Sequence, residues 1–172
     1  LTAIDQEGRL TILADRYEGQ RLNSPNDLWV DPRGGIYFSD PRYLGHEAIE
    51  QPVMGVYRID TDGSIHRIIS DAGKPNGVCI SPDQKTLYVV SNDNGATGFE
   101  RLGTAEDAKG PVAPAAPLRK GHMALMAYDL HEDGTATFRE TLVDYSPEDG
   151  PDGLICDADG NLVVAVRAES RP

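Results

Sequence analysis

The stretch that decides the fold is KPNGVCISPDQKTLYVV, residues 74–90. It begins with a Pro-Asn-Gly signature, continues through an apolar run and a polar turn, and ends in a second apolar run. The same arrangement occurs in SPNDLWVDPRGGIYF, residues 24–38, and in GPDGLICDADGNLVVAV, residues 150–166. Two apolar runs joined by a tight polar turn predict a β-hairpin, and repeats at this scale are typical of propellers and solenoids.

A second kind of hairpin precedes each signature. Residues 1–12, 56–68 and 126–138 alternate apolar and polar residues on both sides of an Asp/Gly turn, which is the pattern of a half-exposed hairpin. One unit therefore holds four strands. The signatures at Pro25 and Pro75 are 50 residues apart, close to the roughly 40–50 residues of a four-stranded propeller blade. Since no segment has helical periodicity, the predicted fold is an all-β propeller of four-stranded blades, of which residues 1–172 cover about three.

Counting strands places several segments on one face of this predicted propeller. The signatures lead into the innermost strands, so they share a face with the connection at residues 39–54 and with residues 92–121. We call this the signature face, and the opposite one, which carries the Asp/Gly turns, the turn face. Residues 92–121 are rich in Gly, Pro and Ala and are predicted to be a long loop inserted in a single partial propeller domain, residues 1–172; loops of this length are usually functional or disordered.

Composition excludes some classes of partner. Sixteen basic and twenty-eight acidic residues leave a net charge of −12, which disfavours nucleic acid and anionic membranes. No apolar run approaches the length of a membrane span. Cys79 and Cys156 lack zinc-site spacing and are expected to be buried free thiols facing opposite sides of their strands. The chain starts at Leu1 within a strand pattern, so we expect an internal piece of a longer protein, and its compartment and protein partners stay open.

One oxygen-bearing side chain in each signature suggests a shared ligand. Asn26, Asn76 and Asp152 are expected at the ends of three inner strands, around the central channel. Amide and carboxylate oxygens suit a hard divalent cation such as calcium, with magnesium and manganese as alternatives, and the absence of Cys and His from the signatures disfavours zinc. The alternative is that Pro-Asn-Gly and Pro-Asp-Gly merely form turns, because Asn and Asp bond their own backbone. Three copies in register at channel-facing positions favour the ligand site.

The quoted motifs resemble one known family. RLNSPND at residues 21–27, GIYFSDP at residues 35–41, the whole of residues 74–88, and the Pro-Asp-Gly hairpin are similar to the gluconolactonase branch of the regucalcin/senescence-marker-protein (SMP-30) superfamily. This resemblance implies a six-bladed propeller that binds one divalent cation, typically calcium, and hydrolyses sugar lactones.

The resemblance also implies roles for individual residues. Asn76 and Asp152 match the metal-ligating asparagine and aspartate of the family. Asn26 matches an asparagine that contacts substrate or completes the metal shell. A glutamate ligand from the family's first blade has no counterpart, since Glu7 is expected in a turn-face turn and Glu18 in a loop leading to the first signature.

The resulting hypothesis is metal-assisted hydrolysis of a sugar lactone to its aldonic acid, without an organic cofactor. The cation polarises the lactone carbonyl, Asp152 holds the cation and acts as general base, and Asn26 orients the substrate. His46, on the signature face, is a candidate substrate contact, and weaker candidates are His122, Arg167, Glu169 and Ser170. Two alternatives remain open: a non-catalytic propeller that serves as a protein-interaction platform, and a related metal-dependent hydrolase of phosphate or aromatic esters.

Overall fold

The computed structural model describes residues 1–97 and 121–166. Residues 98–120 and 167–172 lie outside this description, and with them most of the predicted insertion and the candidates Arg167, Glu169 and Ser170. Every regular element among the described residues is a β-strand, as the sequence predicts. The described residues contain no helix long and apolar enough to cross a membrane.

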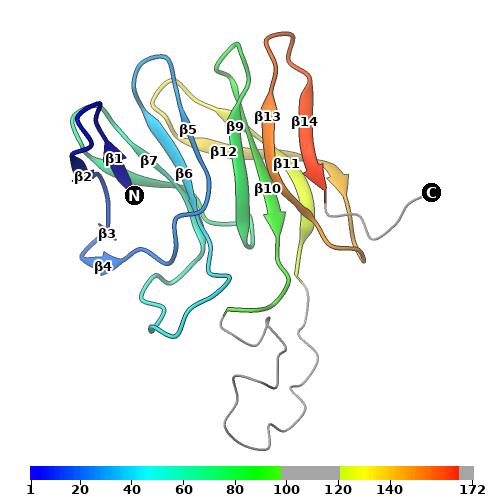
Figure 1. Ribbon diagram of the computed structural model, residues 1–172. Helices are drawn as coiled ribbons and strands as arrows, with labels where there is room; N and C mark the ends of the chain where they lie inside the picture. The colour runs from blue at the N-terminus through cyan, green and yellow to red at the C-terminus, as the bar shows by residue number, and fades with distance from the viewer. Residues whose placement is uncertain (98–120, 167–172) are drawn as a thin grey trace, which may run out of the picture.

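Two four-stranded antiparallel sheets form the centre of the molecule (Figure 1). The first sheet runs in the order β5 (Leu28–Val30), β6 (Ile36–Asp40), β7 (Gly55–Ile59), β8 (Ile65–Ile69). The second runs in the order β9 (Pro75–Ile80), β10 (Thr86–Asn92), β11 (Met123–Leu130), β12 (Ala136–Asp144). In both sheets the strand that follows the signature forms one edge. The strand order confirms the predicted four-stranded unit.

Three smaller strand pairs flank these sheets. They are β1 (Thr2–Ile4) with β2 (Leu10–Ile12), β3 (Arg16–Tyr17) with β4 (Gln20–Arg21), and β13 (Pro151–Cys156) with β14 (Leu162–Val166). The first and last pairs are the hairpins expected from the sequence.

The pair β3–β4 corrects the expectation of a plain loop around Glu18. Glu18 and Gly19 have φ values of 51° and 78°, and positive φ at two successive residues is what a tight hairpin turn of the primed type requires. The Gln51 side chain then donates hydrogen bonds to the carbonyls of Tyr17 (3.2 Å) and Gln20 (2.9 Å). A distant glutamine therefore fixes a hairpin that local sequence did not indicate.

The core that matters for the site lies between the two large sheets. Tyr37, Val56 and Ile69 of the first sheet pack against alternate residues of the second, which include Val78, Ile80, Leu87, Val89, Ala124, Met126 and Tyr128. Alternation of this kind follows from the two-residue period of a strand. The packing brings the inner strand β9 into contact with both β5 and β13.

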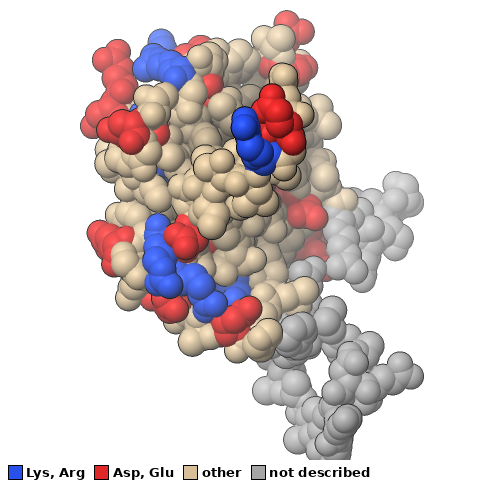
Figure 2. Space-filling model, turned by 60° about the vertical axis from the view of Figure 1, so that its left-hand side comes forward, with Lys and Arg blue, Asp and Glu red and all other residues tan. Residues whose placement is uncertain are grey.

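The ends of the strands separate the signatures from the turns. In Figure 1 the signature segments, residues 41–54 and residues 93–97 gather at the lower end, while the Asp-rich turns lie at the upper end. The strand count therefore assigns both faces correctly. On the surface drawn in Figure 2, basic side chains lie next to acidic ones.

The two cysteines are free thiols, as expected. Cys79 is fully buried, and burial raises the pKa of its thiol to about 12. Cys156 is only half-buried, so the expectation of complete burial is wrong for this residue. Its strand belongs to a two-stranded sheet that exposes Ile155 and Val163.

Candidate functional site

The second and third signatures meet at the signature face. The Asn76 side chain, at the start of β9, donates a hydrogen bond from Nδ2 to Oδ1 of Asp152 in β13, with a length of 2.7 Å. Asn76 is 5% exposed, whereas Asp152 is open to solvent. The fold thus joins a buried amide to an accessible carboxylate across 76 residues of sequence.

Gly77 makes this approach possible. A Cβ atom at position 77 would lie 2.7 Å from the Asp152 carbonyl oxygen and 3.1 Å from Cα of Gly153. These distances are shorter than ordinary van der Waals contact, so any larger residue would push β9 and β13 apart. The glycine of the second signature therefore serves strand packing.

The first signature reaches the pair through backbone links. Asn26 has its side chain exposed on the signature face, and its N–H donates to the Ser39 carbonyl at 3.0 Å. The Ser39 hydroxyl, at the end of β6, donates in turn to the Asn76 carbonyl oxygen at 2.5 Å. The structure thus ties the first signature to the second through Ser39.

Asp27 forms a second link between the same strands. Its Oδ2 accepts a hydrogen bond from the Val78 N–H of β9 (3.0 Å), and its Oδ1 accepts one from Leu28 N–H (2.9 Å). Its own N–H donates to the Ser39 hydroxyl oxygen at 3.1 Å. Asp27 therefore bridges the inner strands of the two large sheets.

Asp40 holds the loop that leads to Asn26. The fully buried carboxylate accepts the backbone N–H groups of Asn23 and Ser24, both at 2.8 Å. Burial raises the pKa of Asp40, and the two N–H donors oppose that rise because they stabilise the charged form. The Asp40 carboxylate therefore fixes the backbone at the start of the first signature.

His46 lies beside the first signature. It contributes to a hollow of about 340 Å³ lined by Asn23, Ser24, Arg42 and Glu47 among others. Neither Asn76 nor Asp152 is among its lining residues. The structure therefore places His46 near Ser24 on the signature face, in a recess separate from the Asn76–Asp152 pair.

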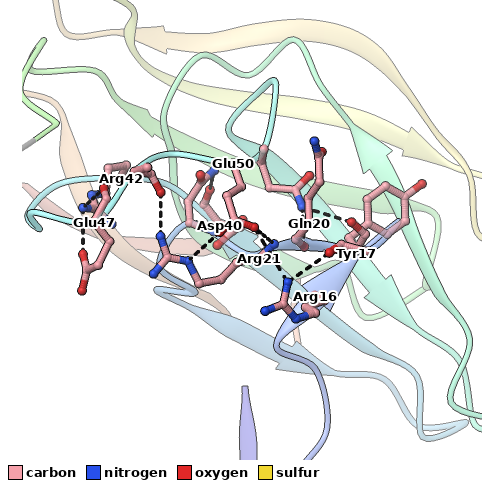
Figure 3. Close-up of polar contacts among 12 residues, drawn as sticks. Arg16, Tyr17, Gln20, Arg21, Asp40, Arg42, Glu47 and Glu50 are labelled. Carbon is pink, nitrogen blue, oxygen red and sulfur yellow. Dashed lines mark hydrogen bonds and ion pairs between the residues drawn. The ribbon is translucent and has the colours of Figure 1, made fainter.

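Two arginines that line this hollow, Arg21 and Arg42, form ion pairs (Figure 3). Arg42 is buried and donates to the Glu47 carboxylate at 2.9 Å, and Nε of the Arg21 guanidinium lies 3.7 Å from the Glu50 carboxylate. Gly45 passes so close to the Arg42 guanidinium that a Cβ atom there would lie 2.1 Å from Nη2. Much of the positive charge at this recess is thus matched by carboxylates, which suits a polar, uncharged ligand.

Two buried cations hold the first residues of the predicted insertion. Lys74 is 2% exposed; its ammonium donates to Asn94 Oδ1 (2.9 Å) and to the Ala96 carbonyl, and lies 5.0 Å from the centre of the Tyr43 ring. Arg42 Nε donates to the Thr97 carbonyl at 3.1 Å. The chain leaving β10 is therefore anchored at the signature face up to residue 97.

Asn76, Asp152 and Asn26 fit a hard divalent cation by their donor chemistry. Amide and carboxylate oxygens are the ligands that calcium takes, and the side chains of Asn76 and Asp152 already converge. Within residues 1–97 and 121–166 there is no cluster of three His, Cys, Asp or Glu side chains that could hold a metal ion. The candidate ligand set Asn26, Asn76 and Asp152 is not such a cluster, because two of its three members are asparagines.

Sequence reasoning missed the buried or half-buried polar residues that support these groups. Ser39, Asp40, Ser91 and Asn92 follow the apolar runs of β6 and β10. Asn92 Nδ2 donates to the carbonyls of Gly150 (3.1 Å) and Pro151 (3.0 Å), so it holds the third signature. Two consecutive polar residues end both β6 and β10 at the signature face, and this pattern in the sequence could have indicated their role. His122, a weaker candidate, is exposed just before β11.

Fold and site together define an all-β protein of the propeller type with oxygen donors gathered on one face. Residues 1–97 match the family model described as the SMP-30/gluconolactonase/LRE-like region. This match covers more than half of the chain, and the chain belongs to that family.

Known proteins agree with this assignment. The chain is 30% identical to a gluconolactonase of Zymomonas mobilis over 90% of its length. The structure superposes with a TM-score of 0.68 on a gluconolactonase from Xanthomonas campestris, at 31% identity and over 95% of this chain. It shares the fold of a calcium-binding protein, regucalcin, from Agrobacterium tumefaciens, with a TM-score of 0.56 and 24% identity over 95% of this chain and 45% of that one.

The chain is shorter than these relatives. It spans 40% of the Zymomonas mobilis protein and 48% of the Xanthomonas campestris structure.

Proposed function

We propose that the complete protein hydrolyses a sugar lactone to the aldonic acid at the signature face, with a divalent cation held by Asn76, Asp152 and Asn26. The observation that carries this proposal is the convergence of the Asn76 amide and the Asp152 carboxylate. The gluconolactonase names of the Zymomonas mobilis and Xanthomonas campestris relatives support lactones as the substrate class.

Asp152 has the properties of a general base. Its carboxylate is exposed, so water and substrate can reach it, and one of its oxygens accepts the Asn76 amide, which fixes its orientation. Water attacking the lactone carbonyl must lose a proton, and a carboxylate within hydrogen-bond reach can accept it. Asp152 then returns the proton to the ring oxygen that leaves as a hydroxyl.

Asn26 and His46 are the proposed substrate contacts. The Asn26 side chain is exposed on the signature face, where its amide can bond a lactone hydroxyl. His46 borders the polar hollow beside the first signature and would meet the more distant hydroxyls of the substrate. These contacts would orient the ring so that its carbonyl faces Asp152.

The cation would supply Lewis-acid polarisation of the carbonyl when bound. The three candidate ligands offer only amide and carboxylate oxygens, which suit a hard cation rather than zinc, and calcium is the ion that we propose. The regucalcin that shares this fold is named as a calcium-binding protein, which agrees with that choice.

We further propose a six-bladed ring for the complete protein. The two complete sheets have four strands each, and this chain covers 48% of the Xanthomonas campestris relative. Three units in roughly half of such a protein correspond to six in the whole. Residues 92–121 would then be a loop inserted between the second and third strands of one blade.

Replacing Asp152 tests the proposed chemistry. Asp152→Ala should lower the rate of glucono-lactone hydrolysis about 10²-fold or more, since positioned acid–base groups contribute on that scale. The matched control is Asp159→Ala, which removes an exposed carboxylate from the turn-face end of the same hairpin. Proton release measures both rates. An Asp152→Ala protein as active as the control would exclude this role, and activity on phosphate or aromatic esters alone would redirect the assignment to another hydrolase.

A further inference from the structure

The backbone around Asn76 lacks regular support from its own sheet. β9 pairs with β10 through Val78 and Val89, and the next pair is Pro75 with Ser91. Residues 76 and 77 of β9 thus face a single residue of β10, and this irregularity is a β-bulge in β9. Bulges interrupt the ladder and re-aim side chains, often next to functional sites. Something other than the β10 ladder must fix the position of Asn76.

The first sheet provides that support on both sides of Asn76. The Ser39 hydroxyl donates to the Asn76 carbonyl at 2.5 Å, and the Asp27 carboxylate accepts the Val78 N–H at 3.0 Å. Ser39 is fully buried, and its hydroxyl oxygen accepts the Asp27 N–H at 3.1 Å. Asp27 and Ser39 therefore act as one unit, which we call the Asp27–Ser39 clasp.

The position of Asp27 is occupied by Gly77 in the second signature, where contact with the next inner strand is made differently. Gly77 follows Asn76 as Asp27 follows Asn26, and the neighbouring chain at Asp152 and Gly153 approaches Gly77 directly. At the position after the signature asparagine, Asp27 reaches the next inner strand with its side chain, whereas Gly77 has no side chain to do so. The clasp thus spans the junction between the first and second signatures alone.

We infer that Asp27 and Ser39 are positioning residues that hold Asn76 in the orientation needed to bind the cation with Asp152. This inference rests on the proposed function, because it assigns Asn76 to the cation site. Asp27 and Ser39 act through the backbone of β9 rather than by touching the ligand. Outer groups that orient ligands typically change metal affinity 10–100-fold when removed.

The test compares four variants of the complete protein. Asp27→Ala and Ser39→Ala each remove one half of the clasp, and Asp27→Asn retains an oxygen that can accept the Val78 N–H. Asp31→Ala is the matched control, because this aspartate accepts N–H groups of its own turn at the far end of β5. Calorimetric titration with calcium gives the affinity, and the nuclear magnetic resonance shift of the Asn76 side-chain amide in calcium-free protein reports its orientation.

We expect Asp27→Ala and Ser39→Ala to weaken calcium binding about 10–100-fold and to shift the Asn76 amide signal. Asp27→Asn should restore the affinity, and Asp31→Ala should leave affinity and signal unchanged. If Asp27→Ala does not fold, the comparison of Ser39→Ala with Asp31→Ala decides the question.

Two results overturn the inference and can be told apart. Wild-type affinity and an unmoved Asn76 signal in Ser39→Ala and Asp27→Ala would remove the positioning role and leave the proposed function standing. No calcium binding by the wild-type protein would remove both the cation site and the role of the clasp in it.

Discussion

At the residue scale, the signature face depends on polar side chains that are buried with their hydrogen-bond partners. Asp40 accepts two N–H groups, Ser39 joins two sheets, and Lys74 bonds Asn94 and Ala96. Burying a polar group is costly unless its bonds are made. Each of these residues therefore ties loop conformation to the stability of the fold.

Lys74 offers a direct measure of that coupling. Lys74→Met should lower the free energy of unfolding by roughly 2–4 kcal/mol, because Asn94 Oδ1 and the Ala96 carbonyl lose a charged donor in a buried setting. The control is Lys85→Met, at an exposed lysine of a turn-face turn. Urea unfolding of both variants measures the difference. Equal stability of the two would show that the buried ammonium contributes nothing to the fold.

The two thiols should differ sharply in reactivity. With a pKa raised to about 12 by burial, the Cys79 thiol exists as thiolate in only about one molecule in ten thousand at pH 8. Thiolate, and hence reactivity, increases as the pH rises toward that pKa. A disulfide reagent at pH 8 should therefore modify only Cys156 in the native protein, and both thiols after denaturation. Cys156→Ala should abolish the native reaction; rapid labelling of Cys79 in that variant would contradict its burial.

At the element scale, the inner strands carry the candidate ligands, and the distances between these strands determine how the ligands are arranged. β9 lies between β5 and β13, and its bulge frees Asn76 from the β10 ladder. Gly77 lets β13 approach, while Asp27 reaches across from the first signature. One strand therefore sets the relation between all three signatures.

Enlarging Gly77 should disrupt this spacing. In Gly77→Ala the new methyl group meets the Asp152 carbonyl and the Gly153 Cα, and the resulting overpacking should cost about 1–3 kcal/mol of stability. Gly153→Ala is the matched control, since no heavy atom lies within 4 Å of a Cβ at that position. The midpoint temperature of thermal unfolding and the affinity for calcium should both be lower in Gly77→Ala and unchanged in Gly153→Ala. Tolerance of both substitutions would mean that β9 and β13 lie further apart than described.

At the scale of the whole molecule, strand counting from the sequence predicted the two four-stranded sheets and the gathering of the signatures at one end. It succeeded because alternation and turn residues are local signals. Strand counting did not predict the hairpin β3–β4, since Gln51 stabilises that hairpin from 31 residues away along the chain. Nor did it predict the clasp, because the burial of Ser39 and the reach of Asp27 to Val78 arise only when sheets pack.

The measurement that tests the central claim most directly is lactone hydrolysis by the complete protein during removal and return of calcium. Proton release from glucono-lactone would be followed in calcium-loaded protein, after chelation, and after calcium is added back. We predict turnover that stops on chelation and recovers with calcium, while the protein stays folded throughout. Turnover that continues unchanged in fully chelated protein, or its absence in folded, calcium-loaded protein, would contradict the proposed cation-dependent lactonase.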